Sequence, residues 1–271
     1  MKEDTASELP HDGTAEAHFS HYASPLIDRA LHCAAALRAD PDAEVLHKLR
    51  VSLRRLRSLL WAYRPLLDSS FEERQRALFK FFANAAGQTR DWDILIELLD
   101  DAPRDALQAA RARAFDASRE TLAHAEVKAA LRDALKQANT ELNTAHSRTS
   151  LPKFARKRLA SAQKSMKKRL KHAAKAKRSD YASYHEVRKA QKKLRYLTEF
   201  FEPMLTKKQR SAIRPLKKIQ KRFGALNDAV ASEQLLRANE NVFADHAQAA
   251  RALDALAKER KRRMRAAGKL L

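Results

Sequence analysis

Two short stretches of the sequence carry positively charged side chains at the spacing of successive helical turns. The first reads HKLRVSLRRLR from residue 47, and the second reads HEVRKAQKKLR from residue 185. Each begins with a histidine and places arginine or lysine three, seven and ten positions later. On a helix these positions span an arc of about 80° and a length of about 15 Å, so they form one stripe. Such a stripe suits an anion, because guanidinium groups grip phosphate oxygens bidentately and lysine adds a compact charge.

An apolar stripe accompanies each charged one. The charged stripes consist of His47, Arg50, Arg54 and Arg57 in the first stretch and His185, Arg188, Lys192 and Arg195 in the second. The apolar stripes, roughly a third of a turn away, consist of Leu46, Leu49, Leu53, Leu56, Leu60, Tyr63 and Leu67, and of Val187, Leu194, Phe201 and Leu205. We expect the apolar side chains to form the core and the cations to border it. Cations gathered there repel one another and lose hydration, which makes sense only with a bound anion.

The two stretches belong to an internal repeat. A constant offset of 138 residues relates His47 to His185 and Pro65 to Pro203, and GQTRD at 87–91 matches GALND at 224–228 with an offset of 137. We expect the two matched glycines to end helices as C′ residues. An internal pseudo-twofold would turn both charged stripes toward a groove between the two halves.

Further cations occupy matching positions beside the stripes. Arg55 corresponds to Lys193, and Lys80 corresponds to Lys217 on the helices that follow. Lys221 lies one turn beyond Lys217, and Arg90 lies in GQTRD where the second half has Asn227. We expect these lysines and arginines to line the same groove.

Helix-forming residues dominate the elements that must position the stripes. Among 271 residues there are four glycines, and no stretch has the pattern of a strand. We predict an all-α protein of about ten helices arranged in bundles. Predicted helix starts include Asp42 as an N-cap and Ser69 or Ser70 as the next. We expect residues 1–18 to be a disordered tail and 19–271 to be one domain, with repeats at about 19–145 and 146–271.

The net charge of +22 indicates an anionic partner. It is distributed unevenly, because residues 1–145 carry a net charge of −3 and residues 146–271 carry +25. Residues 153–178 hold 12 lysines and arginines and no acid. Because these charges surround their helix, they suit any polyanion, and unspecific nucleic-acid binding of the nucleoid type is the alternative function.

Other functions find little support in the sequence. Cys33 is the single cysteine, and no 18-residue apolar run or signal peptide is found, so we expect a cytoplasmic protein that does not span a membrane. Asp91 and Asp228 could join the two histidines in a metal-dependent phosphohydrolase, but the usual metal-ligand spacings are absent. We expect these aspartates to be helix caps, and we expect no enzyme activity, metal or cofactor.

The motif H-x-x-R-x-x-x-[RK]-[RK]-x-R, present twice and each time followed by G-x-x-[RN]-D, resembles that of the CHAD domain, the conserved histidine α-helical domain. The resemblance covers about residues 20–271. It implies two pseudo-symmetric four-helix bundles whose basic central surface binds inorganic polyphosphate through the two charged stripes. It also implies association with polyphosphate or storage granules, or pairing with a triphosphate-tunnel enzyme. Lysine replaces arginine at 192 and 193, which keeps the charge but loses the planar fork.

The two histidines have two open interpretations. Protonation at a pKa near 6.5 would let His47 and His185 strengthen anion binding below neutrality. Alternatively, both are structural residues held by a carboxylate such as Glu199.

Overall fold

The computed structural model describes residues 13–39, 42–99, 102–145, 148–177, 179–211 and 214–271. Within these ranges it contains no strand, only an isolated bridge between Thr14 and Ser150, so the all-α prediction is confirmed. Two 3₁₀ turns lie at Glu202–Met204 and Glu240–Val242. The α-helices are α1 (Ala15–Ala39), α2 (Ala43–Tyr63), α3 (Ser69–Ala85), α4 (Gln88–Leu98), α5 (Arg104–His124), α6 (Val127–Thr144), α7 (Leu151–Lys175), α8 (Tyr181–Phe200), α9 (Lys207–Ser211), α10 (Arg214–Arg237) and α11 (His246–Gly268).

The first helix begins earlier than the expected tail allows. Residues 15–18 are helical, and Ala15 is fully buried. The Glu16 carboxylate accepts hydrogen bonds from the Thr149 backbone N–H at 3.0 and 3.1 Å, which fixes this end of α1 beside the start of α7. The rest of the expected tail, residues 1–12, lies outside the described residues.

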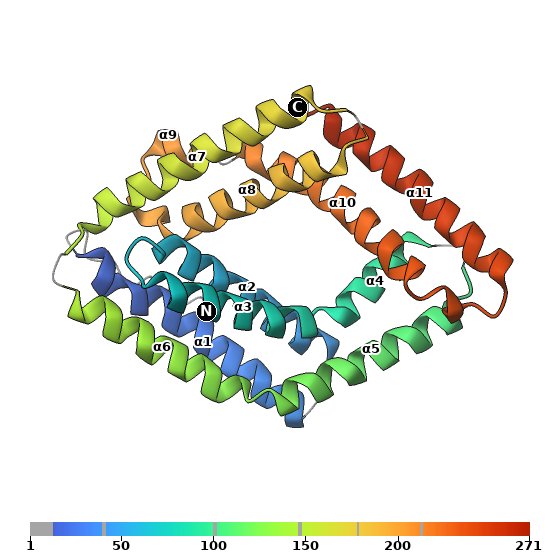
Figure 1. Cartoon of the computed structure of the whole chain (residues 1–271), viewed down its shortest axis with the longest axis horizontal. Helices are drawn as coiled ribbons and strands as arrows, with labels where there is room; N and C mark the ends of the chain where they lie inside the picture. Colours follow the sequence, from blue (N-terminus) through green and yellow to red (C-terminus); the bar gives the residue numbers. More distant parts are fainter. Residues whose placement is uncertain (1–12, 40–41, 100–101, 146–147, 178, 212–213) are drawn as a thin grey trace, which may run out of the picture.

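The two helices that carry the repeated motif, α2 and α8, lie in the middle of the molecule (Figure 1). Helix α2 packs against α1, α3 and α8, while α10 packs against α4, α8 and α11. Helices α5, α6, α7 and α11 form the outer sides of the arrangement (Figure 1). Segments from the first and second halves of the chain therefore meet where α2 packs against α8, where α4 packs against α10, and where the start of α1 contacts the start of α7. The division into two symmetric repeats stays a prediction.

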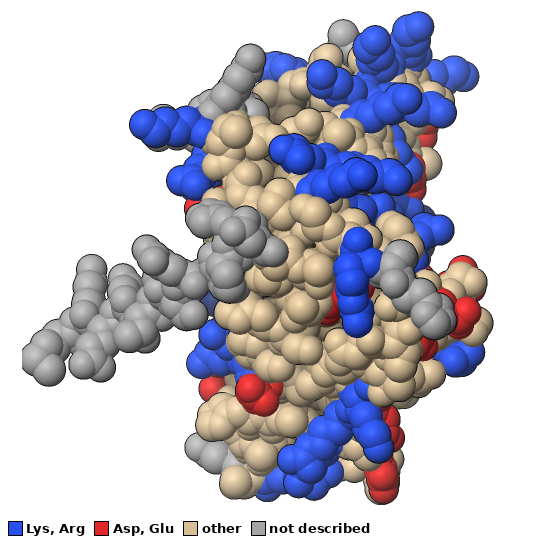
Figure 2. Space-filling model, turned by 90° about the vertical axis from the view of Figure 1, so that its left-hand side faces the viewer, with Lys and Arg blue, Asp and Glu red and all other residues tan. Residues whose placement is uncertain are grey.

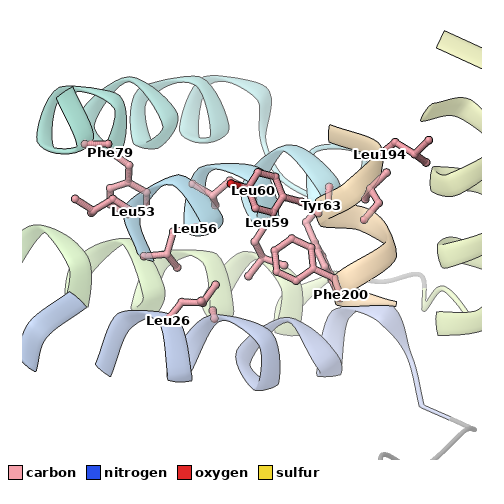
Figure 3. Close-up of a cluster of buried hydrophobic side chains, with 14 of the residues drawn as sticks. Leu26, Leu53, Leu56, Leu59, Leu60, Tyr63, Phe79, Leu194 and Phe200 are labelled. Atoms are coloured by element: carbon pink, nitrogen blue, oxygen red, sulfur yellow. The ribbon is translucent and has the colours of Figure 1, made fainter. Parts of the chain in front are cut away.

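Two apolar clusters hold these helices. The larger one joins α1, α2, α3, α6, α7 and α8, and it also takes in buried residues of α5, α10 and α11. Figure 3 shows leucines of α2 directed into it. Every residue of the apolar stripe predicted on α2 is buried, and so are the four predicted for the second stretch. The smaller cluster joins α4 and α5 to α10 and α11, around the fully buried Leu95, Leu107, Leu236 and Leu256.

The predicted capping of helix starts is confirmed at α2 and wrong at α3. Asp42 caps α2 by accepting a hydrogen bond from the Glu44 N–H, as predicted. The prediction of Ser69 or Ser70 for α3 is wrong, because Asp68 is the N-cap. Its carboxylate accepts the Phe71 N–H at 2.9 Å and the Ser70 hydroxyl at 2.5 Å, so the longer acidic side chain makes the bond that serine was expected to make.

The smaller cluster provides a test of whether the chain unfolds as one unit. Replacing the fully buried Leu95 by alanine removes contacts shared by both halves of the chain. We expect Leu95→Ala to lower the free energy of unfolding by about 2–5 kcal/mol. Helicity and tryptophan fluorescence should show one coincident transition in urea, since Trp92 lies in this cluster and Trp61 packs against the larger one. Two separate transitions would show that the clusters unfold independently.

Candidate anion-binding site

A small cavity of about 170 Å³ lies where α2, α4, α8 and α10 meet. Side chains from both predicted stripes reach it, namely Arg50 and Arg54 from α2 and Arg188 from α8. The complete lining is His47, Arg50, Arg54, Arg90, Asp91, Ile94, Arg188, Asn227, Asp228, Ala231 and Ser232. The predicted meeting of the two stripes is therefore present in the structure.

Arg50 is held by the segment between α3 and α4. Its Nη1 donates a hydrogen bond to the Gly87 carbonyl at 2.6 Å and to the Asp91 carboxylate at 3.1 Å. A Cβ at Gly87 would lie only 2.0 Å from this nitrogen and 3.0 Å from the Ala83 carbonyl oxygen. Gly87 follows the C-cap of α3, as predicted, but its φ of −109° is not left-handed. The close approach of Arg50 therefore explains this glycine.

The matching glycine of the second half has a different role. Gly224 lies inside α10, so the prediction that it ends a helix is wrong. The buried neighbours Phe223 and Leu226 continue the apolar face of α10, and a Cβ at Gly224 would meet nothing within 4 Å. No arginine approaches here as Arg50 approaches Gly87.

The two aspartates of the matched segments are not helix caps. Asp91 lies in the first turn of α4 and accepts a hydrogen bond from Arg50, whereas the N-cap of α4 is Gly87. Asp228 lies in the middle of α10, so its predicted capping role is wrong. Burial raises the pKa of Asp228, against the lowering influence of Arg188 and Arg263. Both carboxylates therefore serve as partial counter-charges for arginines.

Lys192 does not line the cavity, but it lies close enough to the lining residues Arg54 and Arg188 for their charges to act on it. Burial is the main cause that lowers its pKa to about 6, and the positive charges of Arg54 and Arg188 lower it further. Burial also lowers the pKa of Arg188, while Asp228 raises it. Lys192 is therefore mostly neutral at pH 7 and would gain a proton if an anion were bound beside it.

The cations continue along α2 past the cavity. Burial, followed by the charges of Arg76 and Arg54, lowers the pKa of Arg57, and burial and Arg76 lower that of Lys193. The ring of Trp61 then lies beneath two cations, with Lys193 Nζ at 4.9 Å and Arg158 Cζ at 4.6 Å from its centroid. We call the whole set the central cation cluster: Arg50, Arg54, Arg57, Arg76, Arg158, Arg188, Lys192 and Lys193.

The central cation cluster has more positive charges and hydrogen-bond donors than the neighbouring side chains have carboxylates and acceptors. Glu72 binds Arg76 at 3.1 Å, and Asp91 and Asp228 act on Arg50 and Arg188, which leaves an excess of positive charge. Buried arginine Nε atoms with no hydrogen-bond partner among the described residues belong to Arg57, Arg76, Arg158 and Arg188, and also to Arg55 and Arg195. Buried donors usually have partners, so these unpartnered N–H groups show that the protein itself does not fully satisfy the arginines of this region.

Several predicted residues lie outside the cluster. Arg55 binds Glu199 at 3.3 Å across the α2/α8 contact, and Arg195 approaches the same carboxylate at 3.4 Å. Arg90 lines the cavity but binds Glu97 at 3.2 Å. The predicted lysines Lys80, Lys217 and Lys221 are exposed and do not line the cavity.

The two histidines differ from each other. His47 lines the cavity, whereas His185 lies with its Nδ1 3.3 Å from the Tyr181 hydroxyl. Tyr181 donates a hydrogen bond to Asn227 at 3.2 Å. Burial, followed by the nearby Lys189 and Arg188, lowers the pKa of His185, so this ring becomes protonated only below its ordinary range. Glu199 binds Arg55 and Arg195 and holds neither histidine in this structure.

Three members of the site escaped the sequence analysis. Arg76, Arg158 and Trp61 complete the far end of the cluster, yet none belongs to the repeated motif. In the sequence these residues stand in or after basic or apolar runs. Such runs do not show which side chains from different helices come together in the fold. Among the described residues, no three histidine, cysteine or acidic side chains gather as a metal site, and no helix is long and apolar enough to cross a membrane.

Comparisons with known proteins agree with this fold. Residues 21–237 match the family model of the CHAD domain. The structure is similar to the crystal structure of the CHAD domain from the plant Ricinus communis, with a TM-score of 0.77, 23% identity, and coverage of 97% of this chain and 94% of that one. It is also similar to PptA from Streptomyces chartreusis, with a TM-score of 0.70, 15% identity, and coverage of 95% and 98%. No curated protein matches the sequence.

The two matched glycines should respond oppositely to substitution. Gly87→Ala places a methyl group against Arg50 and the Ala83 carbonyl, so we expect a loss of stability of about 1–3 kcal/mol. Gly224→Ala adds a methyl group in open space inside α10, and we expect a gain of about 0.5–1 kcal/mol. Urea unfolding of both variants measures the difference, and equal effects would show that Arg50 does not depend on Gly87.

Lys192 should lower the stability of the free protein. Its pKa of about 6 in the folded chain lies below its ordinary value of 10.5, so the unfolded chain binds this proton more tightly. The wild-type free energy of unfolding therefore loses a contribution as the pH falls from about 10.5 to about 6, and Lys192→Met lacks this loss. At pH 7 we expect the variant to be more stable by about 1 kcal/mol or more. Urea unfolding at pH 6, 7 and 9 tests this, and a difference that is independent of pH would contradict it.

Proposed function

Because the chain belongs to the CHAD domain family, we propose that it binds inorganic polyphosphate along the central cation cluster. The observation that carries the proposal is the run of cations beside α2 and α8, most of them partly buried, whose positive charge exceeds that of the neighbouring carboxylates. From Arg50 to Trp61 this run follows α2 for about 16 Å. A linear chain of phosphates presents acceptors at regular intervals along such a line.

The size of the cavity favours phosphate over larger groups. At about 170 Å³, lined by arginine and carboxylate side chains, it suits phosphate groups and has no aromatic platform on which a base could stack. Arginine forks can hold non-bridging phosphate oxygens in two-point contacts, and Lys192 can add a single charge. Binding would replace the counterions along the phosphate chain, so the affinity should fall as salt increases.

Phosphate binding should be coupled to the protonation of Lys192. In the free protein this amine is mostly neutral at pH 7, whereas a phosphate beside it would stabilise the ammonium form. Binding should therefore take up a proton and strengthen as the pH falls from 8 to 6. Lys192 would therefore cause part of the increase in affinity at lower pH that the sequence analysis expected from His47 and His185.

We propose that the protein holds the phosphate chain without cleaving it, in the cytoplasm. The cluster supplies cations to bind phosphate but no group of metal ligands among the described residues. Association with storage granules or with a triphosphate-tunnel enzyme follows from the family resemblance and stays an expectation. Release of orthophosphate in the presence of a divalent metal would contradict the non-catalytic part of the proposal.

Unspecific nucleic-acid binding is the second candidate, and the surface of α7 favours it. Figure 2 shows lysine and arginine side chains gathered over the upper part of one face of the molecule, toward α7. Exposed lysines and arginines of this helix are Lys153, Arg156, Lys157, Lys164, Lys167, Lys168, Lys171 and Lys175. Such a surface would attract any polyanion by releasing counterions.

A calorimetric titration with long-chain polyphosphate at about 150 mM salt separates the two candidates, since salt suppresses unspecific attraction. We expect tight binding that duplex DNA of matched charge does not displace. Arg54→Ala combined with Lys192→Ala should weaken the binding at least tenfold, because it removes two cations from the centre of the cluster.

The matched control is Arg132→Ala with Lys136→Ala on α6. Both side chains are exposed, and the pair removes the same formal charge far from the cluster in sequence. We expect little change in affinity for this pair. If both double variants weaken binding equally, or if DNA displaces polyphosphate, the interaction depends on overall charge and the nucleic-acid candidate takes first place.

A further inference from the structure

A second group of cations surrounds a hollow between α10 and α11. The hollow has a volume of about 440 Å³. Two of its cations come from α10, two from α11 and the fifth is the residue that caps the C-terminal end of α11, while Ala266 and Leu270 complete the lining. No carboxylate is among the described residues that line it, whose cations are Lys218, Arg222, Arg262, Arg265 and Lys269.

This hollow lies on another side of α11 from the central cavity. Arg263 points toward the interior, since its Nη1 donates to the Ala225 carbonyl at 2.8 Å and its charge acts on Asp228. At 100° per residue, Arg262, Arg265 and the C-cap Lys269 fall within about 60° of one another and on average about 130° from Arg263. The hollow and the central cavity also share no lining residue.

Few of these charges are compensated within the chain. Arg262 forms a two-point ion pair with Glu259, with Nε to Oε2 at 2.5 Å and Nη2 to Oε1 at 2.6 Å. In the part of the chain that the structure describes, no ion pair is found for Lys218, Arg222, Arg265 or Lys269. Charges of one sign that converge on one hollow repel each other unless an anion is bound between them.

The electrostatics of helix ends explains only part of this arrangement. Arg265 and Lys269 lie at the C-terminal end of α11, where positive charge is favourable even without a ligand. Lys218 and Arg222 lie in the first half of α10, where the helix dipole gives them no such benefit. The dipole therefore does not account for the convergence of cations from both helices.

We propose that this hollow is a second anion-binding site, which takes a short run of phosphate groups. Arginines from both helices can form two-point contacts with phosphate oxygens, while the lysines add charge at the rim. Its volume exceeds that of the central cavity, so it has room for more than one phosphate group. The site stands independently of the function proposed for the central cluster. Its phosphates come either from a polyphosphate chain that is also bound to the cluster or from a separate small oligophosphate.

Tripolyphosphate is the probe for the test, because a chain of three phosphates is short enough to bind within the hollow alone. The background is Arg54→Ala with Lys192→Ala, in which the central cluster is weakened. To this background Arg222→Ala and Arg265→Ala are added, and both substituted side chains are exposed. The control adds Arg132→Ala and Lys136→Ala instead, with the same loss of charge. Helicity and thermal unfolding verify that each variant is folded.

We expect the background protein to bind tripolyphosphate in calorimetry at about 150 mM salt. The added Arg222→Ala and Arg265→Ala should weaken this residual binding about tenfold or more, while the control pair leaves it nearly unchanged. Absence of binding in the background protein, or equal losses with the two added pairs, would overturn the second site.

Long-chain polyphosphate then distinguishes the two sources. If Arg222→Ala with Arg265→Ala in the otherwise wild-type chain weakens long-chain binding about tenfold, one chain spans the hollow and the cluster. If it leaves long-chain binding unchanged while tripolyphosphate binding in the background is lost, the hollow takes a separate oligophosphate. Both results support the site. Failure of the proposal for the central cation cluster would give a different result: Arg54→Ala with Lys192→Ala would not change the affinity for long-chain polyphosphate.

Discussion

The structure is organised around positive charge that is kept partly out of water without enough negative charge to balance it. Burial, followed by the charges of Arg54 and Arg188, lowers the pKa of Lys192 to about 6, so this amine is mostly neutral at pH 7. Burial and the charge of Arg54 also lower the pKa of Arg188, against the opposing effect of Asp228. Such an arrangement costs stability in the free protein, and the apolar faces of α2 and α8 must offset that cost. The fully buried leucines on α2, directly beside the cations, serve this purpose.

The surrounding helices hold the cations in place in different ways. Gly87 and Asp91 fix Arg50 from the α3/α4 side, whereas Asp228 acts on Arg188 from α10. Glu199 binds Arg55 and lies close to Arg195, and so joins α2 to α8 beside the cluster. These contacts orient the arginines without neutralising all of them. A ligand would therefore meet side chains that are already positioned, which reduces the entropy lost on binding.

The repeated motif allowed much of this site to be predicted from the sequence. Helical periodicity placed Arg50, Arg54, Arg188 and Lys192 correctly beside a core of leucines, because the angle between stripes is fixed by helix geometry. Periodicity along one helix could not predict which side chains other helices bring, so Trp61, Arg76 and Arg158 were missed.

Residues that align in the internal repeat were expected to have the same role, but some of them have different roles in the structure. Gly87 and Gly224 align in the repeat, but only Gly87 has an arginine against it, and α10 runs on where α3 ends. The lysine at 192 illustrates the same limit. Its position was predictable, but its low pKa depends on burial among charges from several helices.

Proton uptake on binding tests the central claim most directly. Titrations of long-chain polyphosphate at pH 7 in two buffers with different ionisation enthalpies measure the protons taken up. If an anion occupies the central cluster, wild-type protein should take up nearly one proton more per site than Lys192→Met, because Lys192 becomes charged beside the phosphates. Equal proton uptake by both proteins, with equal affinity, would show that polyphosphate does not bind at Lys192 and would contradict the account.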